Sequence, residues 1–101
     1  MSLTNPSREE TRYMGACKRL GCTVCIIEGF GPSPCDFHHM LRNGKRIGHL
    51  MGFGLCSSHH SAGVNTPACV SRHPWKAAFE RRYGSEASLL QKTRELLKWS
   101  S

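Results

Sequence analysis

Apolar residues follow a helical period only toward the C-terminal end of the chain. The stripe lies at positions i, i+1, i+4, i+7 and i+8 and consists of Leu89, Leu90, Thr93, Leu96 and Leu97. Ser85 precedes the stripe as an N-cap, and Gly84 ends a shorter helical segment that begins at Trp75. The pattern predicts two C-terminal helices within residues 75–99, with the leucine stripe in the core.

Upstream, the apolar runs are short and separated by turn-forming residues. Val24–Ile27 and Phe37–Leu41 predict strands. Asn43-Gly44 tolerates positive φ at both positions, so it predicts a tight turn between a strand that ends near Leu41 and one that begins near Arg46.

A short helix is expected after these strands. Ser57 or Ser58 can cap it, His59 and His60 lie within it, and Gly63 stops it. The predicted order is therefore strand, turn, strand, helix, followed by the two C-terminal helices.

Residues 1–16 have no apolar period, so we expect a flexible N-terminal arm before one domain over residues 17–101. The chain contains no run of the roughly 20 apolar residues that a membrane span needs. Its first residues lack the apolar core of a signal peptide. We expect a cytoplasmic protein with no membrane partner, whose thiols stay reduced.

Composition adds two constraints. A chain of 101 residues buries a small hydrophobic core and often needs a bound metal or disulfides to stabilise it. Its six cysteines and six histidines supply many metal-ligand atoms. The excess of 14 Lys and Arg over 7 Asp and Glu gives a net charge of +7, which favours an anionic partner, with nucleic acid as the first candidate.

Two half-sites with the same three-residue spacing predict a structural zinc site. Cys22 and Cys25 form a CxxC, and Cys56 and His59 can complete a Cys3His set around a tetrahedral ion. A redox dithiol would need a thioredoxin-like context, and a disulfide framework would need export. Bound zinc can stabilise a small domain by on the order of 10 kcal/mol.

Two HH pairs remain beside the zinc ligands. His38 and His39 lie on the first predicted strand, where consecutive side chains point to opposite faces. His60 follows the proposed zinc ligand His59, so on a helix it points about 100° away from the zinc and is free for a second role.

The order of these motifs resembles a known family. The chain has CxxC, HH, Gly-Lys-Arg-x-Gly-His, LCxxHH and then SxHxxxxxFxxxYGxExxLL, which is similar to the HNH endonuclease superfamily and, within it, to the phage recombination enhancement nucleases of the Ref type. The resemblance covers roughly residues 22–97. It implies a small α+β domain of the zinc-stapled ββα-metal (HNH) type with C-terminal helices, and metal-dependent hydrolysis of DNA phosphodiester bonds in a bacterial host cell.

The resemblance also implies residue roles. His38 and His60 take the positions that ligate a catalytic divalent ion, which can be Mg, Mn or Zn, and His39 takes the position of the general base. His49 falls near the middle residue of the motif, where it can orient the base or bind metal. His73 is a further candidate ligand of the catalytic ion, or a phosphate contact.

The remaining candidates are less specific. Cys17, Cys35 and Cys69 are expected to be buried free thiols, and a second zinc site using them with His73 is the alternative. Basic residues beside the active strand can contact the DNA backbone, and the best candidates are Arg42, Lys45 and Arg46.

Two functions of different class are compatible with the sequence. A DNA endonuclease uses both a base and a second metal site, whereas a non-catalytic zinc-binding module that docks on nucleic acid or protein needs neither. The resemblance further implies a RecA filament as a possible partner. The N-terminal arm is nearly neutral, with Arg8 and Arg12 against Glu9 and Glu10, so it should attract DNA only weakly.

Overall fold

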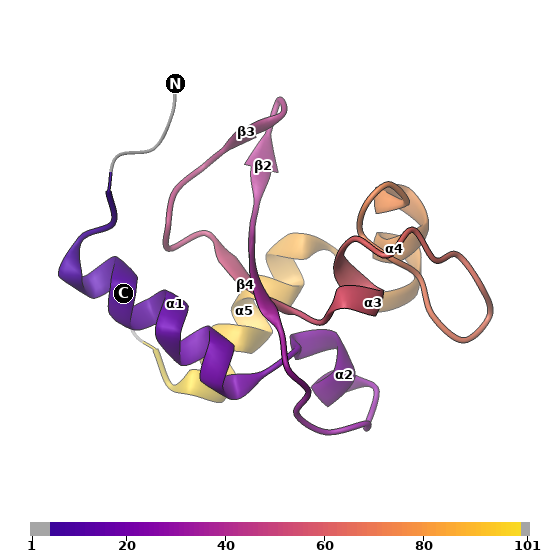
Figure 1. The fold of residues 1–101 in the computed structure, drawn as a ribbon, viewed down its shortest axis with the longest axis horizontal. Coiled ribbons are helices and arrows are strands. Elements are labelled where there is room, and N and C mark those ends of the chain that lie inside the picture. Colours follow the sequence, from indigo (N-terminus) through magenta and orange to yellow (C-terminus); the bar gives the residue numbers. More distant parts are fainter. Residues whose placement is uncertain (1–4, 100–101) are drawn as a thin grey trace.

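The computed structural model describes residues 5–99 and has the predicted α+β architecture (Figure 1). Its elements in chain order are α1 (Arg8–Leu20), α2 (Thr23–Ile27), β1 (Asp36–His39), β2 (Leu41–Arg42), β3 (Lys45–Arg46), β4 (Gly52–Leu55), α3 (Ser57–His60), α4 (Lys76–Tyr83) and α5 (Glu86–Leu97).

Two short antiparallel pairs make up the β structure. β1 pairs with β4, with His38 opposite Phe53 and His39 opposite Gly52. β2 pairs with β3 across Asn43 and Gly44, whose φ angles of 53° and 77° confirm the predicted turn. This second hairpin projects from the body of the molecule (Figure 1).

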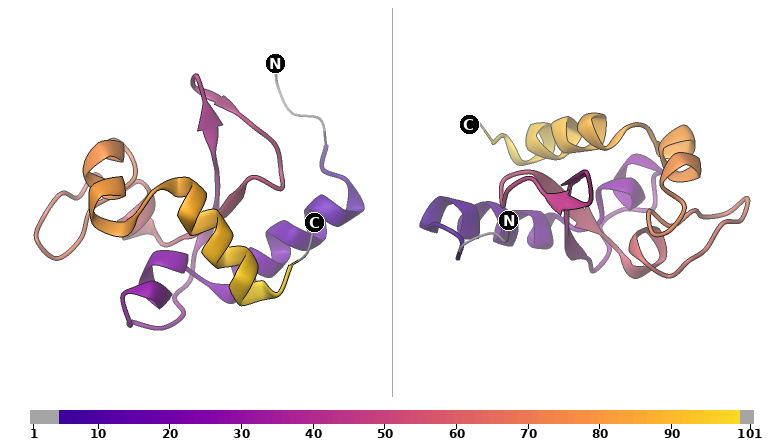
Figure 2. Two further views of the ribbon diagram at one scale, coloured as in Figure 1. Left: turned by 180° about the vertical axis from the view of Figure 1, so that it is seen from behind. Right: turned by 90° about the horizontal axis from the view of Figure 1, so that it is seen from above.

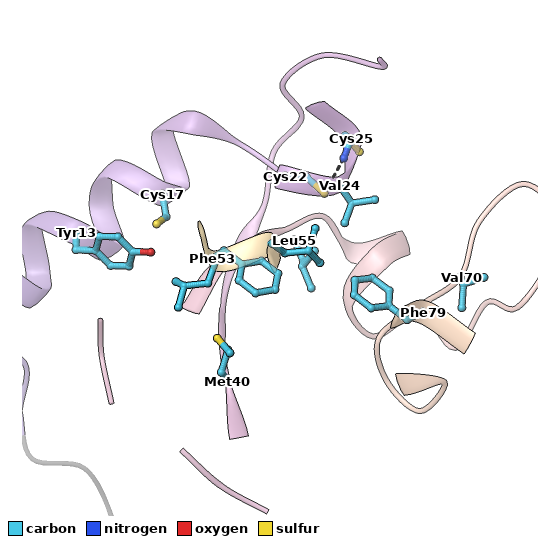
Figure 3. Packing of buried hydrophobic residues seen from close by; sticks show 12 residues of the cluster. Tyr13, Cys17, Cys22, Val24, Cys25, Met40, Phe53, Leu55, Val70 and Phe79 are labelled. Atoms are coloured by element: carbon cyan, nitrogen blue, oxygen red, sulfur yellow. Dashed lines mark hydrogen bonds between the residues drawn. The ribbon is translucent and has the colours of Figure 1, made fainter. Parts of the chain in front are cut away.

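The core forms around β4, all of whose residues are buried. α1, α2 and α5 contact this strand, and α1 also contacts α5; in Figure 2, α5 crosses one face of the strands. In Figure 3, Phe53 and Leu55 of β4 lie between Tyr13 on one side and Val24 and Phe79 on the other. The Tyr13 hydroxyl donates a 2.7 Å hydrogen bond to the carbonyl of Gly52, which fixes α1 against β4.

The expectation of a flexible arm over residues 1–16 is wrong for residues 8–16, which belong to α1, while residues 1–4 lie outside the described part of the chain. Ser7 and Glu10 form a capping box, with reciprocal bonds of 3.1 Å and 2.7 Å. Tyr13 and Cys17 are fully buried, four residues apart on one face. The capping box and this apolar face are local signals that the expectation of an arm did not use, and packing against β4 stabilises the helix.

The predicted strand Val24–Ile27 is also wrong, because these residues lie in α2. Cys22 is the N-cap of α2, and its sulfur accepts a bond from the amide of Cys25 (Figure 3). A continuous run of four apolar residues does not distinguish a buried strand from a buried helical turn.

The helices that follow confirm the prediction with small differences. α3 contains His59 and His60, but its N-cap is Cys56 rather than Ser57 or Ser58. In α5, Leu89, Leu90 and Thr93 are buried as expected, whereas Leu96 is 38% exposed. Thr93 is fully buried and its hydroxyl pairs with that of Thr23 at 2.7 Å, joining α5 to α2.

No helix within residues 5–99 has both the length and the apolar character that crossing a membrane requires.

Gly54 allows α1 and the segment before β1 to approach β4. A Cβ at this position would lie 2.6 Å from the Cys35 sulfur and 2.8 Å from the Gly21 carbonyl oxygen. We expect Gly54→Ala to destabilise the fold by about 1–3 kcal/mol, because the clash involves backbone. Gly48→Ala is the matched control, since a Cβ there meets nothing within 4 Å. Equal thermal midpoints for the two variants would contradict this packing.

Candidate metal centres and active site

The residues predicted to bind structural zinc lie together in the structure. Cys22 and Cys25 come from the start of α2, and Cys56 and His59 come from the N-cap and third residue of α3. Their candidate ligand atoms all lie within 4.8 Å of one another. The CxxC and the CxxH therefore join two helices that are thirty residues apart in the sequence.

The spacing of the four donors fits a tetrahedral ion. A zinc ion with Zn–S distances of about 2.3 Å and a Zn–N distance of about 2.0–2.1 Å separates two sulfurs by about 3.8 Å and a sulfur and a nitrogen by about 3.6 Å. The Cys25 and Cys56 sulfurs are 3.8 Å apart. His59 Nδ1 lies 3.6 Å from Cys22, 3.5 Å from Cys25 and 3.2 Å from Cys56. Nδ1 of His59 is therefore the nitrogen that faces the three thiols.

Burial disfavours the charged form of two groups in this cluster. Desolvation raises the pKa of the Cys22 thiol to about 12, although backbone hydrogen bonds from Cys56 and Cys25 offset part of this effect. Desolvation also lowers the pKa of His59, so its ring is neutral. Two buried thiols and one half-buried thiol held this close are suited to a divalent cation, which binds thiolates and displaces their protons.

A second cluster contains only histidines. His38 from β1, His60 from α3 and His73 from the turn before α4 have ligand atoms within 4.8 Å of one another. Their ring centroids are 5.2–5.5 Å apart. The backbone amide of His73 donates a 2.8 Å bond to the carbonyl of His60, which holds these two residues side by side.

Desolvation favours the neutral form of two members of this cluster, His60 and His73. Desolvation lowers the pKa of His60, and neighbouring His38 and His73 lower it further. Desolvation and the Arg72 guanidinium lower the pKa of His73. Neutral imidazole nitrogens are good ligands for divalent transition metals. The structure therefore brings together the three histidines that the sequence suggested for a catalytic ion.

Glu86 and Arg72 contact this cluster, and the sequence analysis gave neither a role. Glu86 Oε1 lies 2.6 Å from His38 Nε2 and 2.7 Å from Arg72 Nε, and all three side chains are buried. Burial raises the pKa of Glu86, but the hydrogen bonds from His38 and Arg72 outweigh this effect and lower it to about 2. Glu86 appears in the YGxExxLL pattern, but a lone glutamate at a helix start is a common feature that carries no specific signal.

His39 lies on the same strand as His38 and contacts different residues. Its Nε2 is 3.2 Å from Nδ1 of His49, and its ring packs edge-on against Phe37. Desolvation, followed by the charge of Arg46 and by His49 and His38, lowers the pKa of His39 to about 4. His39 is therefore neutral at pH 7. Among the described residues, neither His39 nor His49 belongs to a cluster of candidate metal ligands.

One cleft of about 160 Å³ joins these groups. It is lined by Phe37, Leu41 and Arg46 together with His38, His39, His60 and His73. Arg46 is thus the predicted nucleic-acid contact that reaches the histidines, while Arg42 and Lys45 are exposed on the same hairpin. An open groove of about 500 Å³ shares Phe37, His39 and Arg46 with the cleft and extends to Lys18 on α1.

The other cysteines form no second metal site among the described residues. Cys17 is a buried free thiol as expected, whereas Cys35 and Cys69 are partly exposed. The Cys69 thiol donates to the carbonyl of Ser58. His73 lies with His38 and His60, so the alternative of a zinc site combining it with these cysteines is wrong.

A family model described as "Recombination enhancement, RecA-dependent nuclease" matches residues 6–98, nearly the whole chain. No curated protein matches significantly.

We expect the folded protein to contain one tightly bound zinc ion per chain at Cys22, Cys25, Cys56 and His59. Cys56→Ala should remove the zinc and much of the stability, because zinc binding contributes on the order of 10 kcal/mol. Cys69→Ala is the matched control, a second partly exposed thiol that lies outside the cluster. Elemental analysis and thermal unfolding measure both effects. Zinc-free folded protein, or equal losses in the two variants, would refute the site.

Proposed function

Because the chain belongs to the family of recombination enhancement, RecA-dependent nucleases, we propose that it is a metal-dependent endonuclease of the HNH type that hydrolyses DNA phosphodiester bonds. The observation that carries the proposal is the cleft in which three clustered histidines, the neutral His39 and Arg46 meet. The antiparallel pairing of β1 with β4, which α3 follows directly, supports a ββα-metal fold.

His38, His60 and His73 would hold the catalytic divalent ion. Such an ion neutralises charge on the scissile phosphate and on the leaving oxygen. Imidazole ligands suit Zn or Mn, and Mg is compatible where phosphate and water oxygens complete the coordination. A non-catalytic zinc module is the alternative function, but it has no use for a second ligand cluster beside a neutral histidine.

His39 is the proposed general base. Its lowered pKa keeps the ring neutral at pH 7, so it can accept a proton from the attacking water. The short contact with His49 supports an orienting role for the latter. If His39 Nε2–H donates to His49 Nδ1, then Nδ1 of His39 keeps its lone pair for the water proton.

The basic hairpin supplies contacts to the substrate. Arg46 reaches the cleft and can bind a phosphate next to the scissile bond. Arg42 and Lys45 extend this charge along the exposed β2–β3 hairpin, where a DNA backbone can approach. We assign the three residues to backbone contacts, which set affinity without reading sequence.

We expect His39→Ala to lower the cleavage rate by about 10²–10⁴-fold, the usual contribution of a general base, while leaving the zinc content and fold unchanged. Nicking of plasmid and single-stranded DNA with added Mg, Mn or Zn measures the rate. His60→Ala is the comparison, because it should lose activity through weaker metal binding and recover part of it at high metal concentration. Undiminished nicking by His39→Ala would exclude His39 as the base.

Arg42→Ala and Lys45→Ala should each weaken DNA binding for all sequences and reduce the slope of log K against log salt by about 1. Arg81→Ala is a matched control, since Arg81 is exposed on α4, away from the hairpin (Figure 1). Fluorescence anisotropy over a range of salt concentrations measures the slopes. Equal slopes for hairpin and control variants would remove the hairpin from the interface.

The family description includes RecA dependence, so we expect a RecA filament with ATP to stimulate cleavage of a D-loop by this chain. Intrinsic cleavage without RecA should be low and strongly dependent on salt. His39→Ala serves as the catalytically inactive control. Equal rates with and without RecA would remove the filament as a partner and leave an independent nuclease.

A further inference from the structure

Beneath the histidine cluster, a chain of buried polar contacts joins the β1 strand to the C-terminal helix. His38 Nε2 lies 2.6 Å from Glu86 Oε1, and the side chains are 1% and 6% exposed. Arg72 Nε lies 2.7 Å from the same oxygen. Burying a carboxylate costs free energy unless its charge is paired and hydrogen-bonded. For Glu86, Arg72 provides the opposite charge, and both Arg72 and His38 hydrogen-bond to it.

This contact selects one tautomer of His38. A carboxylate oxygen that already accepts from Arg72 can only accept from the imidazole, so His38 Nε2 carries the proton and donates. In a neutral imidazole the other nitrogen then has the free lone pair. Nδ1 is therefore the atom of His38 that is available to a metal.

Contacts to both its backbone and its side chain fix the position of Glu86. Glu86 is the first residue of α5, where the helix N-terminus favours a negative charge. Its backbone amide donates a 2.9 Å bond to Glu80 Oε2 on α4. Arg72 is held to α3 by a 2.8 Å bond from its amide to the carbonyl of His59, so the guanidinium approaches from a fixed backbone.

We propose that Glu86 is a positioning residue for the catalytic ion: it orients His38 and fixes it as an Nδ1 ligand, and Arg72 holds Glu86 in place. The proposal rests on the proposed function, because it takes the histidine cluster as a metal site. It assigns to α5 a part in metal affinity, in addition to its part in the core. Partners that hydrogen-bond a ligating histidine typically contribute 10–100-fold to metal affinity.

Metal titration of zinc-loaded protein tests the proposal. Co²⁺ binding is followed by its visible absorption, with His38→Ala as the baseline for loss of the site. We expect Glu86→Gln to weaken Co²⁺ binding about 10–100-fold. Glu80→Gln is the matched control, because Glu80 is next to Glu86 but contacts its backbone rather than His38. Affinity within twofold of wild type in Glu86→Gln would overturn the proposal.

The tautomer of His38 provides a second measurement that needs no bound Co²⁺. Two-bond ¹⁵N–¹H correlation spectra of the imidazoles distinguish Nε2–H from Nδ1–H. We expect Nε2–H for His38 in wild type and Glu80→Gln, and a mixture of tautomers in Glu86→Gln. An Nδ1–H tautomer in wild type, or an unchanged Nε2–H tautomer in Glu86→Gln, would overturn the positioning role.

The two measurements distinguish failure of the histidine metal site from failure of the orienting contact between Glu86 and His38. If wild type binds no Co²⁺ at the histidines but His38 changes tautomer in Glu86→Gln, the metal site fails and the orienting contact stands. If Glu86→Gln does not fold because Arg72 loses its partner, Glu86→Gln combined with Arg72→Met removes both buried charges. The double variant should fold, retain zinc and show the same loss of Co²⁺ affinity; wild-type affinity would overturn the proposal.

Discussion

The antiparallel pairing of β1 with β4 is the constraint that sets the histidine cluster beside the zinc ligands. β1 carries His38 and His39, and β4 leads directly into Cys56 and α3, so the pairing brings the strand histidines next to the helix that carries His59 and His60. Gly54 is needed within this pair because backbone from the end of α1 approaches it. α1, α2 and α5 then complete the core around β4.

Each HH pair divides its residues between two environments. On β1, alternation along the strand buries His38 against Phe53 and leaves His39 beside Phe37. On α3, the rotation between neighbouring residues turns His59 toward the three thiols and His60 toward His38. These two short elements thus contribute ligands to a cluster suited to structural zinc and to a cluster suited to a second cation, and β1 also carries a separate neutral histidine.

Burial disfavours the charged form of each group whose pKa it shifts, and hydrogen bonding can offset this effect. Desolvation raises the pKa of the Cys22 thiol and lowers the pKa of the His39 imidazole. Glu86 keeps its charge in spite of burial, because two donors share its oxygen. This fixed anion contacts His38 and so orients one candidate ligand of a cation.

The sequence by itself determined the features whose signals are local. The spacing of Cys22, Cys25, Cys56 and His59, the Asn43-Gly44 turn and the leucine stripe of α5 depend on neighbours a few residues away. Tertiary structure decided what depends on distant partners. Tyr13 of α1 donates to the carbonyl of Gly52 on β4, α2 packs against β4 and α5, and Glu86 meets His38 across 48 residues of sequence. Such contacts leave no periodic signal, because only the folded chain brings their partners within hydrogen-bonding distance.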